Sequence, residues 1–203
     1  MRLQVIILLL SCLISLSLAG QNKNNPYPEF KPISHEKSKT AALECDLKVD
    51  KQGMDYHTGA KLLDYTHPDL KRYMIDKELI EIYASVSRAG NQYFIDLNYI
   101  FNSSKGVENY GPHGQGAPVK VHLLNKESLY FKNIKSSRPR VKKEESISYF
   151  NASYLLDDYE IKQLLKSPIL RMEVSYLYGS ESYEVSNITL IRDQLQCLKN
   201  TEI

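Results

Sequence analysis

The segment of this sequence with the most chemical potential is the glycine-rich run Gly111–Gly116, which reads GPHGQG. Glycines let backbone N–H groups approach a ligand, and a histidine followed by glycine occurs in the oxyanion loops of some esterases. Those enzymes also need a Gly-x-Ser-x-Gly elbow, which this chain lacks. The run also lacks the Lys-Ser/Thr ending of a phosphate-binding loop. The pattern therefore predicts a flexible hairpin loop.

Acidic and histidine residues gather between positions 55 and 69, and both types are metal ligands. The group comprises Asp55, His57, Asp64, His67 and Asp69. It contains neither the His-Glu-x-x-His spacing of zinc proteases nor an EF-hand loop. Such side chains in an irregular polar segment are usually solvated turn residues, so we predict no metal site and no cofactor.

Carboxylates on the predicted strands are the remaining catalytic candidates. Paired carboxylates hydrolyse glycosidic bonds, and Glu81, Asp96 and Glu173 are available. Each lies on the polar side of an alternating segment, where solvated charge is the normal state. A hydrolase whose residues meet only in three dimensions is therefore an alternative, and it predicts a pocket that joins His113 or His122 to carboxylates.

Tyrosine is abundant, with 15 residues, and tryptophan is absent. Tyr is enriched at recognition surfaces because it offers rigid area and a polar tip, although it also suits half-buried strands. Binding residues often lie on loops held by a rigid scaffold. We expect them on the loops Tyr110–Gln115 and Ser136–Lys143, and the candidates are Tyr110, His113, Gln115, Arg138 and Arg140.

Three Asn-x-Ser/Thr sequences, at Asn102, Asn151 and Asn187, match the glycosylation pattern. They matter only in a eukaryotic secretory pathway. Asn151 would also have to face outward from its strand.

The N-terminus has the three parts of a secretory signal peptide. Met1 and Arg2 precede an apolar run, and Ser17-Leu18-Ala19 places small residues before a cut at Gly20. The alternatives are an N-terminal membrane anchor and lipoprotein processing at Cys12. We predict a signal peptide over residues 1–19, a flexible polar leader over 20–41 and a single β-rich domain over 42–203.

Cleavage would leave two cysteines, Cys45 and Cys197. Two cysteines in an oxidising compartment predict one disulfide. A reactive thiol would need a neighbouring base and an exposed site, and neither is visible in the sequence.

The formal net charge of the chain is only +2. A near-neutral chain offers no electrostatic basis for binding nucleic acid or anionic membranes. We therefore expect no nucleic-acid partner, and no transmembrane segment after signal cleavage.

Alternation of apolar and polar residues dominates the domain and predicts half-buried strands. Short helical turns are expected near Lys61–Leu63 and Pro68–Met74, and Ser103–Pro118 is expected to be a long loop. Asp157 and Glu160 predict a capped helix over Asp157–Lys166, and Asn187 is expected to cap a last helix. The predicted strands centre on Leu43–Val49, Ile80–Val86, Tyr93–Phe101, Val119–Leu123, Leu129–Lys132, Ile147–Leu156, Leu170–Tyr178 and Ser182–Val185.

Most connections between these seven or eight strands are short, which favours antiparallel pairing. The predicted fold class is therefore mainly β. We expect an antiparallel β-sandwich or open barrel with one or two short helices, one of them at the C-terminus.

The C-terminal third resembles uncharacterised small exported β-rich proteins of Bacteroidetes-type bacteria. The resemblance lies in a strand that ends at Tyr154-Leu155-Leu156, the run Ser167–Met172, the strand Tyr183–Val185 and a closing helix with Cys197-Leu198. It implies a β-domain and an envelope location, and it transfers no catalytic residues.

These observations predict an exported, non-catalytic binding or accessory module that recognises a protein partner in the envelope or the extracellular space. The alternatives are a secreted hydrolase with an unrecognised active site and a structural or adhesive surface protein.

Overall fold

The computed structural model describes residues 45, 47–49, 53–57, 59–66, 79–111, 113–135 and 138–201. Residues 42–203 form one compact unit. The predicted signal peptide, the predicted leader and the helical turn expected near Pro68–Met74 lie outside the described residues, as do His67 and Asp69.

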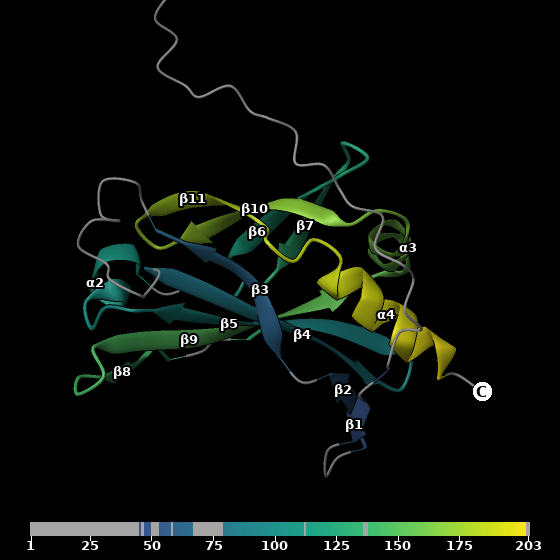
Figure 1. Cartoon of the computed structure of the whole chain (residues 1–203), viewed down its shortest axis with the longest axis horizontal. Coiled ribbons are helices and arrows are strands. Elements are labelled where there is room, and N and C mark those ends of the chain that lie inside the picture. The colour runs from purple at the N-terminus through teal and green to yellow at the C-terminus, as the bar shows by residue number, and fades with distance from the viewer. Residues whose placement is uncertain are drawn as a thin grey trace, which may run out of the picture. The chain divides into compact units, whose positions relative to one another are not determined.

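Two antiparallel sheets build the described part of the chain (Figure 1). The larger sheet has the spatial order β1-β2-β4-β5-β9-β8, with β3 also paired to β4, and the smaller has the order β11-β10-β6-β7. The strands are β1 (Leu47–Val49), β2 (Asp55–His57), β3 (Ala60–Tyr65), β4 (Ile80–Ala89), β5 (Gln92–Phe101), β6 (Pro118–Leu123), β7 (Ser128–Lys132), β8 (Arg140–Lys142), β9 (Ile147–Leu156), β10 (Ile169–Tyr176) and β11 (Gly179–Glu184). The predicted mainly β, antiparallel, sandwich-like fold is confirmed.

The core lies between the two sheets, because alternate residues of each strand point inward. Its middle is aromatic: Tyr99 stacks on Phe150 with ring centroids 4.6 Å apart, and Tyr176 meets Tyr99 edge-on at 6.2 Å. From the smaller sheet, Val121 and Met172 are also buried. The same alternation leaves the polar phase of β4, β5 and β9 on the outer face of the larger sheet.

Three short helices, α2 (Gly106–Tyr110), α3 (Asp158–Lys166) and α4 (Leu190–Asn200), complete the described structure. The capping box predicted for α3 is confirmed, because the Asp157 side chain accepts from the Glu160 N–H and the Glu160 side chain accepts from the Asp157 N–H. The predicted cap at Asn187 is wrong: α4 begins after Thr189, which makes no side-chain cap. Helix α2 lies in a segment expected to be loop.

The helical turn predicted near Lys61–Leu63 is wrong, since these residues belong to strand β3. The register of β3 against β4 shifts between Lys61 and Leu63, so Leu62 and Leu63 are both buried. A β-bulge breaks the period-two pattern of a strand, and two adjacent buried leucines then resemble a helical face. A similar shift at Ile169/Arg171 leaves Leu170 exposed.

Helix α4 completes the hydrogen bonding of β4 where the neighbouring strands leave a gap. β2 pairs with Ser87 and Arg88, β3 pairs with Ile80 to Ala84, and neither pairs with Val86. The Val86 N–H instead donates to Oε1 of Gln194 at 2.8 Å. The predicted disulfide between Cys45 and Cys197 is present, with Cα atoms 5.5 Å apart, and ties α4 to the segment before β1.

Candidate ligand groove

The five residues predicted to bind a partner do not gather in one place. His113 is fully buried, Tyr110 is half-buried, and Gln115, Arg138 and Arg140 are exposed. None of the five lines the groove over β4, β5 and β9. Arg140 lies on strand β8, within the segment that was expected to be a loop. The expectation that these two segments carry binding stays a prediction, with Gln115, Arg138 and Arg140 as its accessible members.

His113 takes part in a buried hydrogen-bond relay. Its Nδ1 lies 2.7 Å from the Ser175 carbonyl oxygen, and its Nε2 lies 2.8 Å from the Tyr154 hydroxyl. A carbonyl oxygen only accepts, so Nδ1–H donates to it and Nε2 accepts from Tyr154. Tyr99, 3.1 Å from Tyr154, then donates to that hydroxyl. Burial lowers the pKa of His113, and the neutral ring anchors the glycine-rich loop to the core.

Asn133 anchors the same loop from the other side. Its Nδ2 donates to the carbonyls of His113 at 3.0 Å and Gly114 at 3.1 Å, and its Oδ1 accepts from the backbone N–H of Ser153 and Lys135. One buried amide therefore links the loop, the end of β7 and strand β9. The loop that was predicted to be flexible is therefore held at His113 and Gly114.

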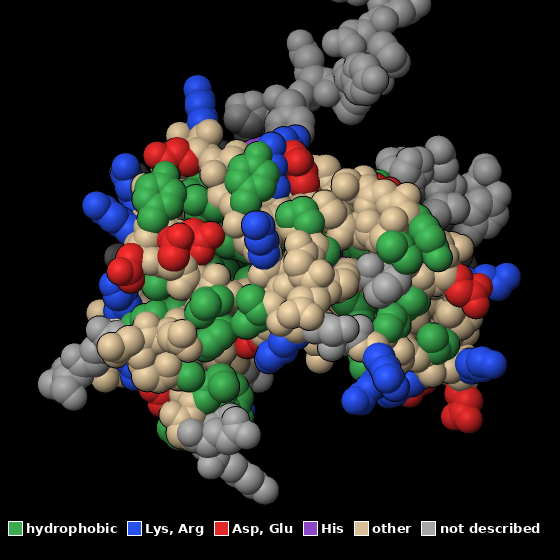
Figure 2. Space-filling view, turned by 180° about the vertical axis from the view of Figure 1, so that it is seen from behind, with side chains coloured by type: hydrophobic (Ala, Val, Ile, Leu, Met, Phe, Trp, Pro, Cys, Tyr) green, Lys and Arg blue, Asp and Glu red, His purple; other side chains and the backbone are tan. Residues whose placement is uncertain are grey.

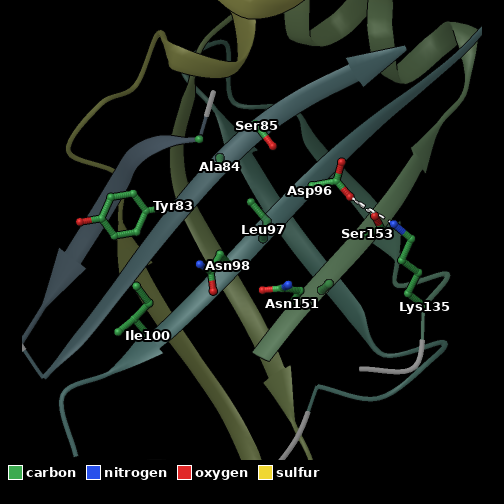
Figure 3. Close-up of a pocket in the computed structure, with 12 residues that line it drawn as sticks. Tyr83, Ala84, Ser85, Asp96, Leu97, Asn98, Ile100, Lys135, Asn151 and Ser153 are labelled. Atoms are coloured by element: carbon green, nitrogen blue, oxygen red, sulfur yellow. Dashed lines mark hydrogen bonds and ion pairs between the residues drawn. The ribbon is translucent and has the colours of Figure 1, made fainter. Parts of the chain in front are cut away.

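A groove of about 830 Å³ lies on the outer face of the larger sheet. Figure 3 shows that side chains from β4, β5 and β9 form its floor, with Lys135 at one side. The lining consists of Gly59, Tyr83, Ala84, Ser85, Asp96, Leu97, Asn98, Ile100, Lys135, Asn151, Ala152 and Ser153. Most of these side chains are short, so the floor is low and open.

Strand register arranges the polar floor in two rows. Tyr83, Asn98 and Asn151 are consecutive cross-strand partners on β4, β5 and β9. Ser85, Asp96 and Ser153 form the neighbouring row, two residues along each strand. Residues two apart on a strand share a face, which is why six residues distant in sequence meet here (Figure 3). Asn151 is exposed, as its use as a glycosylation site would require.

Asp96 is held from several sides at the centre of the floor. Ser87 Oγ donates to one carboxylate oxygen at 3.0 Å, and Ser153 Oγ donates to the other. Lys135 Nζ lies 3.7 Å from that second oxygen. The carboxylate charge is thus offset locally by one ammonium group and two hydroxyl donors.

Tyr83 forms a wall of the groove and is fixed by charged neighbours. Its hydroxyl donates to Glu81 at 3.0 Å, Lys61 Nζ lies 3.2 Å from the same carboxylate, and Asn102 donates to the other oxygen. Burial raises the pKa of Glu81, but hydrogen bonds from Tyr83, Lys61 and Asn102 outweigh it and lower this pKa overall. The tyrosine ring is therefore oriented before any ligand arrives.

Asn98 stands apart from the other floor residues. Its Oδ1 is buried and has no hydrogen-bond partner among the described residues. A buried polar atom without a partner costs free energy. Sequence reasoning missed Asn98 and Asn151 because an Asn on the polar phase of a strand looks like any solvated residue.

A second polar cluster lies on the outer face of the smaller sheet. His122 Nε2 is 2.6 Å from Glu173 Oε1, and Ser128 Oγ is 3.0 Å from His122 Nδ1. The hydrogen bond to His122 lowers the pKa of Glu173. The contact joins His122 to a carboxylate, as the hydrolase alternative predicts, but on an open strand ladder where Ser128 is exposed. His113 lies in the core, apart from this cluster.

No group of three or more acidic, histidine or cysteine residues is arranged for a metal ion within the described ranges. Of the group noted in the sequence, Asp55 pairs with Arg88, and Nε2 of His57 donates to the Gln194 carbonyl oxygen at 3.0 Å. Asp64 lies within 3.7 Å of Lys61. On the face drawn in Figure 2, basic and acidic side chains are interspersed.

No helix in the described part of the chain is long and apolar enough to cross a membrane. No protein-family model, curated protein or solved structure matches the chain. The resemblance to Bacteroidetes-type exported proteins stays a prediction.

Proposed function

We propose that this protein is an exported, non-catalytic binding module and that its partner docks in the groove over β4, β5 and β9. The observation that carries the proposal is a groove of about 830 Å³ whose floor holds two rows of polar side chains from three strands. A concave surface with a few convergent polar groups is the usual form of a ligand site. Tyr83 and Asp96, both held by neighbours, give it rigid walls and floor.

Export is supported by two independent features. The N-terminal sequence has the parts of a signal peptide, and the Cys45–Cys197 disulfide is of the kind that persists in oxidising compartments. The envelope and the extracellular space are both consistent with these features.

Site-specific photo-crosslinking tests the proposal. A photo-reactive phenylalanine derivative replaces Asn151 in the groove, and in a control it replaces Tyr130, which is 61% exposed on the other sheet. The protein is expressed as the full chain and irradiated with the envelope and extracellular fractions of its source. We expect a saturable adduct from position 151 and none from 130. Equal adducts from both positions, or none from 151, would remove the groove as the docking site.

The protein partner expected from the sequence stays a prediction that the same adduct tests. The hydrolase alternative has one supporting observation, the contact of Ser128, His122 and Glu173. A fluorophosphonate probe that labels the wild type but not a Ser128→Ala variant would favour that alternative.

A further inference from the structure

We infer that the groove binds a neutral, hydroxyl-rich glycan; this inference rests on the proposed function and names its ligand class. The starting point is the chemistry of the floor. Its two polar rows offer amide, hydroxyl and carboxylate groups side by side on three strands, so donors and acceptors alternate over a small area. Sugar hydroxyl groups donate and accept at once, and adjacent hydroxyls on one ring match such a pattern.

The amides of Asn98 and Asn151 give the floor neutral polar groups on neighbouring strands. Oδ1 of Asn98 is buried and needs a hydrogen-bond donor. Its cross-strand neighbour Asn151 is exposed beside it. A neutral hydroxyl group pairs with side-chain amides without bringing a charge into the floor, whereas an ammonium group would leave its own charge partly desolvated.

Charge balance argues for a neutral ligand. Asp96 in the floor is matched by Lys135, and Glu81 beside the wall is matched by Lys61. An anionic polymer would meet the Asp96 carboxylate, and a cationic one would compete with Lys135. The chain as a whole carries a net charge of only +2 and provides no field for either.

The wall provides the apolar contact that a sugar ring needs. Tyr83 is half-buried, and its hydroxyl and its ring are held by Glu81 and Lys61. The ring therefore presents a rigid surface to the C–H face of a pyranose. Ile100 extends the apolar border of the same groove.

An extended polypeptide fits the groove less well. In the floor, β4, β5 and β9 are paired with one another in continuous antiparallel register. Their backbone groups are thus already used, and a peptide cannot join as an added strand on this face. Ser85, Ala84, Ser153 and Gly59 also leave no deep apolar pocket for a peptide side chain.

The decisive experiment is the fate of the adduct from position 151. One half of the crosslinked material is digested with proteinase K and the other half is oxidised with periodate, which cleaves vicinal diols. We expect the captured mass to survive the protease, on peptides that span position 151, and to be lost on oxidation. If the captured mass is instead lost on protease digestion and survives periodate, the glycan inference is overturned while the binding-module proposal stands. If no adduct forms specifically at position 151, both proposals fail.

Affinity measurements provide a second test of the glycan inference. The probes are the protease-digested polysaccharide fraction of the native envelope, neutral mannan, xylan and β-glucan, and anionic alginate. We expect binding to a neutral probe that weakens at least about tenfold in Asn98→Ala and in Tyr83→Ala. Asn98→Ala removes an oxygen that has no partner among the described residues, so the hydrogen bonds of that part of the fold are kept.

Tyr130→Ala is the matched control for Tyr83→Ala. Tyr130 also lies on an outer sheet face with a lysine over its ring, Lys120 at 5.6 Å, as Lys61 lies 5.9 Å from the Tyr83 ring. Its affinity should stay within about twofold of the wild type. Equal binding by all three variants, or binding to alginate alone, overturns the inference.

Discussion

Removal of the Cys45–Cys197 disulfide is the perturbation whose effect on stability follows most directly from the structure. The bridge joins residues 152 positions apart. In the chain-entropy model a closed loop of that length restricts the unfolded chain by about 5 kcal/mol at 25 °C. We therefore expect a double Cys45→Ser/Cys197→Ser variant to lose up to about 5 kcal/mol of unfolding free energy. For a domain of this size the melting temperature would fall by roughly 10–20 °C.

Guanidinium denaturation followed by tyrosine fluorescence measures this loss, since the chain has 15 Tyr and no Trp. The unfolded variant lacks the cross-link and exposes more surface, so its m value should rise while its stability falls. Wild-type protein reduced with dithiothreitol is the control and should match the double variant. A loss below about 1 kcal/mol with an unchanged m value would refute the loop-entropy reasoning.

Part of the loss should appear locally. Strand β1 follows Cys45 and pairs only with β2 over three residue pairs, and Val49 is 66% exposed. Without the bridge this edge strand has little to hold it. Amide exchange at Leu47–Val49 should accelerate more in the double variant than exchange at the centre of β5. Uniform acceleration would show that the bridge acts only on the unfolded state.

The remaining predictions concern buried polar groups and close packing. Gln194→Leu leaves the Val86 N–H without its acceptor and should cost about 1–3 kcal/mol by chemical denaturation. Gln163→Leu is the comparison, because Gln163 is equally buried and its Oε1 has no partner within the described part of the chain. This variant should change stability by less than about 0.5 kcal/mol or raise it, and equal losses in the two variants would contradict the assignment. Burial lowers the pKa of His113, so the unfolded chain binds its proton more tightly. Stability should be fully present above about pH 6.5 and fall as the pH drops toward the folded pKa, by at most about 1.4 kcal/mol per pH unit. Denaturation at pH 7 and pH 5 checks this, and a His113→Gln variant that keeps the same slope would refute it. A methyl group at Gly106 would overlap a buried aromatic side chain, so Gly106→Ala should lower the melting temperature, whereas Gly114→Ala, in open space, should not.

Local patterns predict the long strands and helix α3 because their causes are local, whereas β2, β3 and β8 fall in segments that were expected to be irregular, helical or loop. Ile147–Leu156 forms strand β9 with the predicted bounds, and its buried apolar residues Phe150, Ala152, Tyr154 and Leu156 recur every second position. Asp157 and Glu160 are three residues apart and satisfy each other's backbone within one turn. The segment around Lys61–Leu63 was mispredicted because the register shift that buries two adjacent leucines depends on the partner strand β4.

The candidate site shows the same division. His113 was chosen for its glycine neighbours, yet Tyr154 and Ser175, 41 and 62 residues away, place it in the core. Nothing in the sequence marks Asn98 and Asn151 as neighbours, yet strand pairing sets them side by side on the floor of the groove. Glycine spacing describes what a loop is able to do, whereas the neighbours that arrive from distant strands determine what its side chains contact.

The sequence by itself determined the mainly β class, the capped helix α3 and the pairing of the only two cysteines that remain after the predicted signal peptide. The fold class follows from the alternation of apolar and polar residues, the helix cap from the three-residue spacing of Asp157 and Glu160, and the disulfide from the number of cysteines. Only the tertiary structure decided which polar strand faces form a groove and which histidines are buried. It also decided that Gln194 accepts the Val86 N–H of β4. The physical reason is that burial and hydrogen-bond satisfaction are properties of neighbours, and in an antiparallel sheet most of a residue's neighbours are far away in the chain.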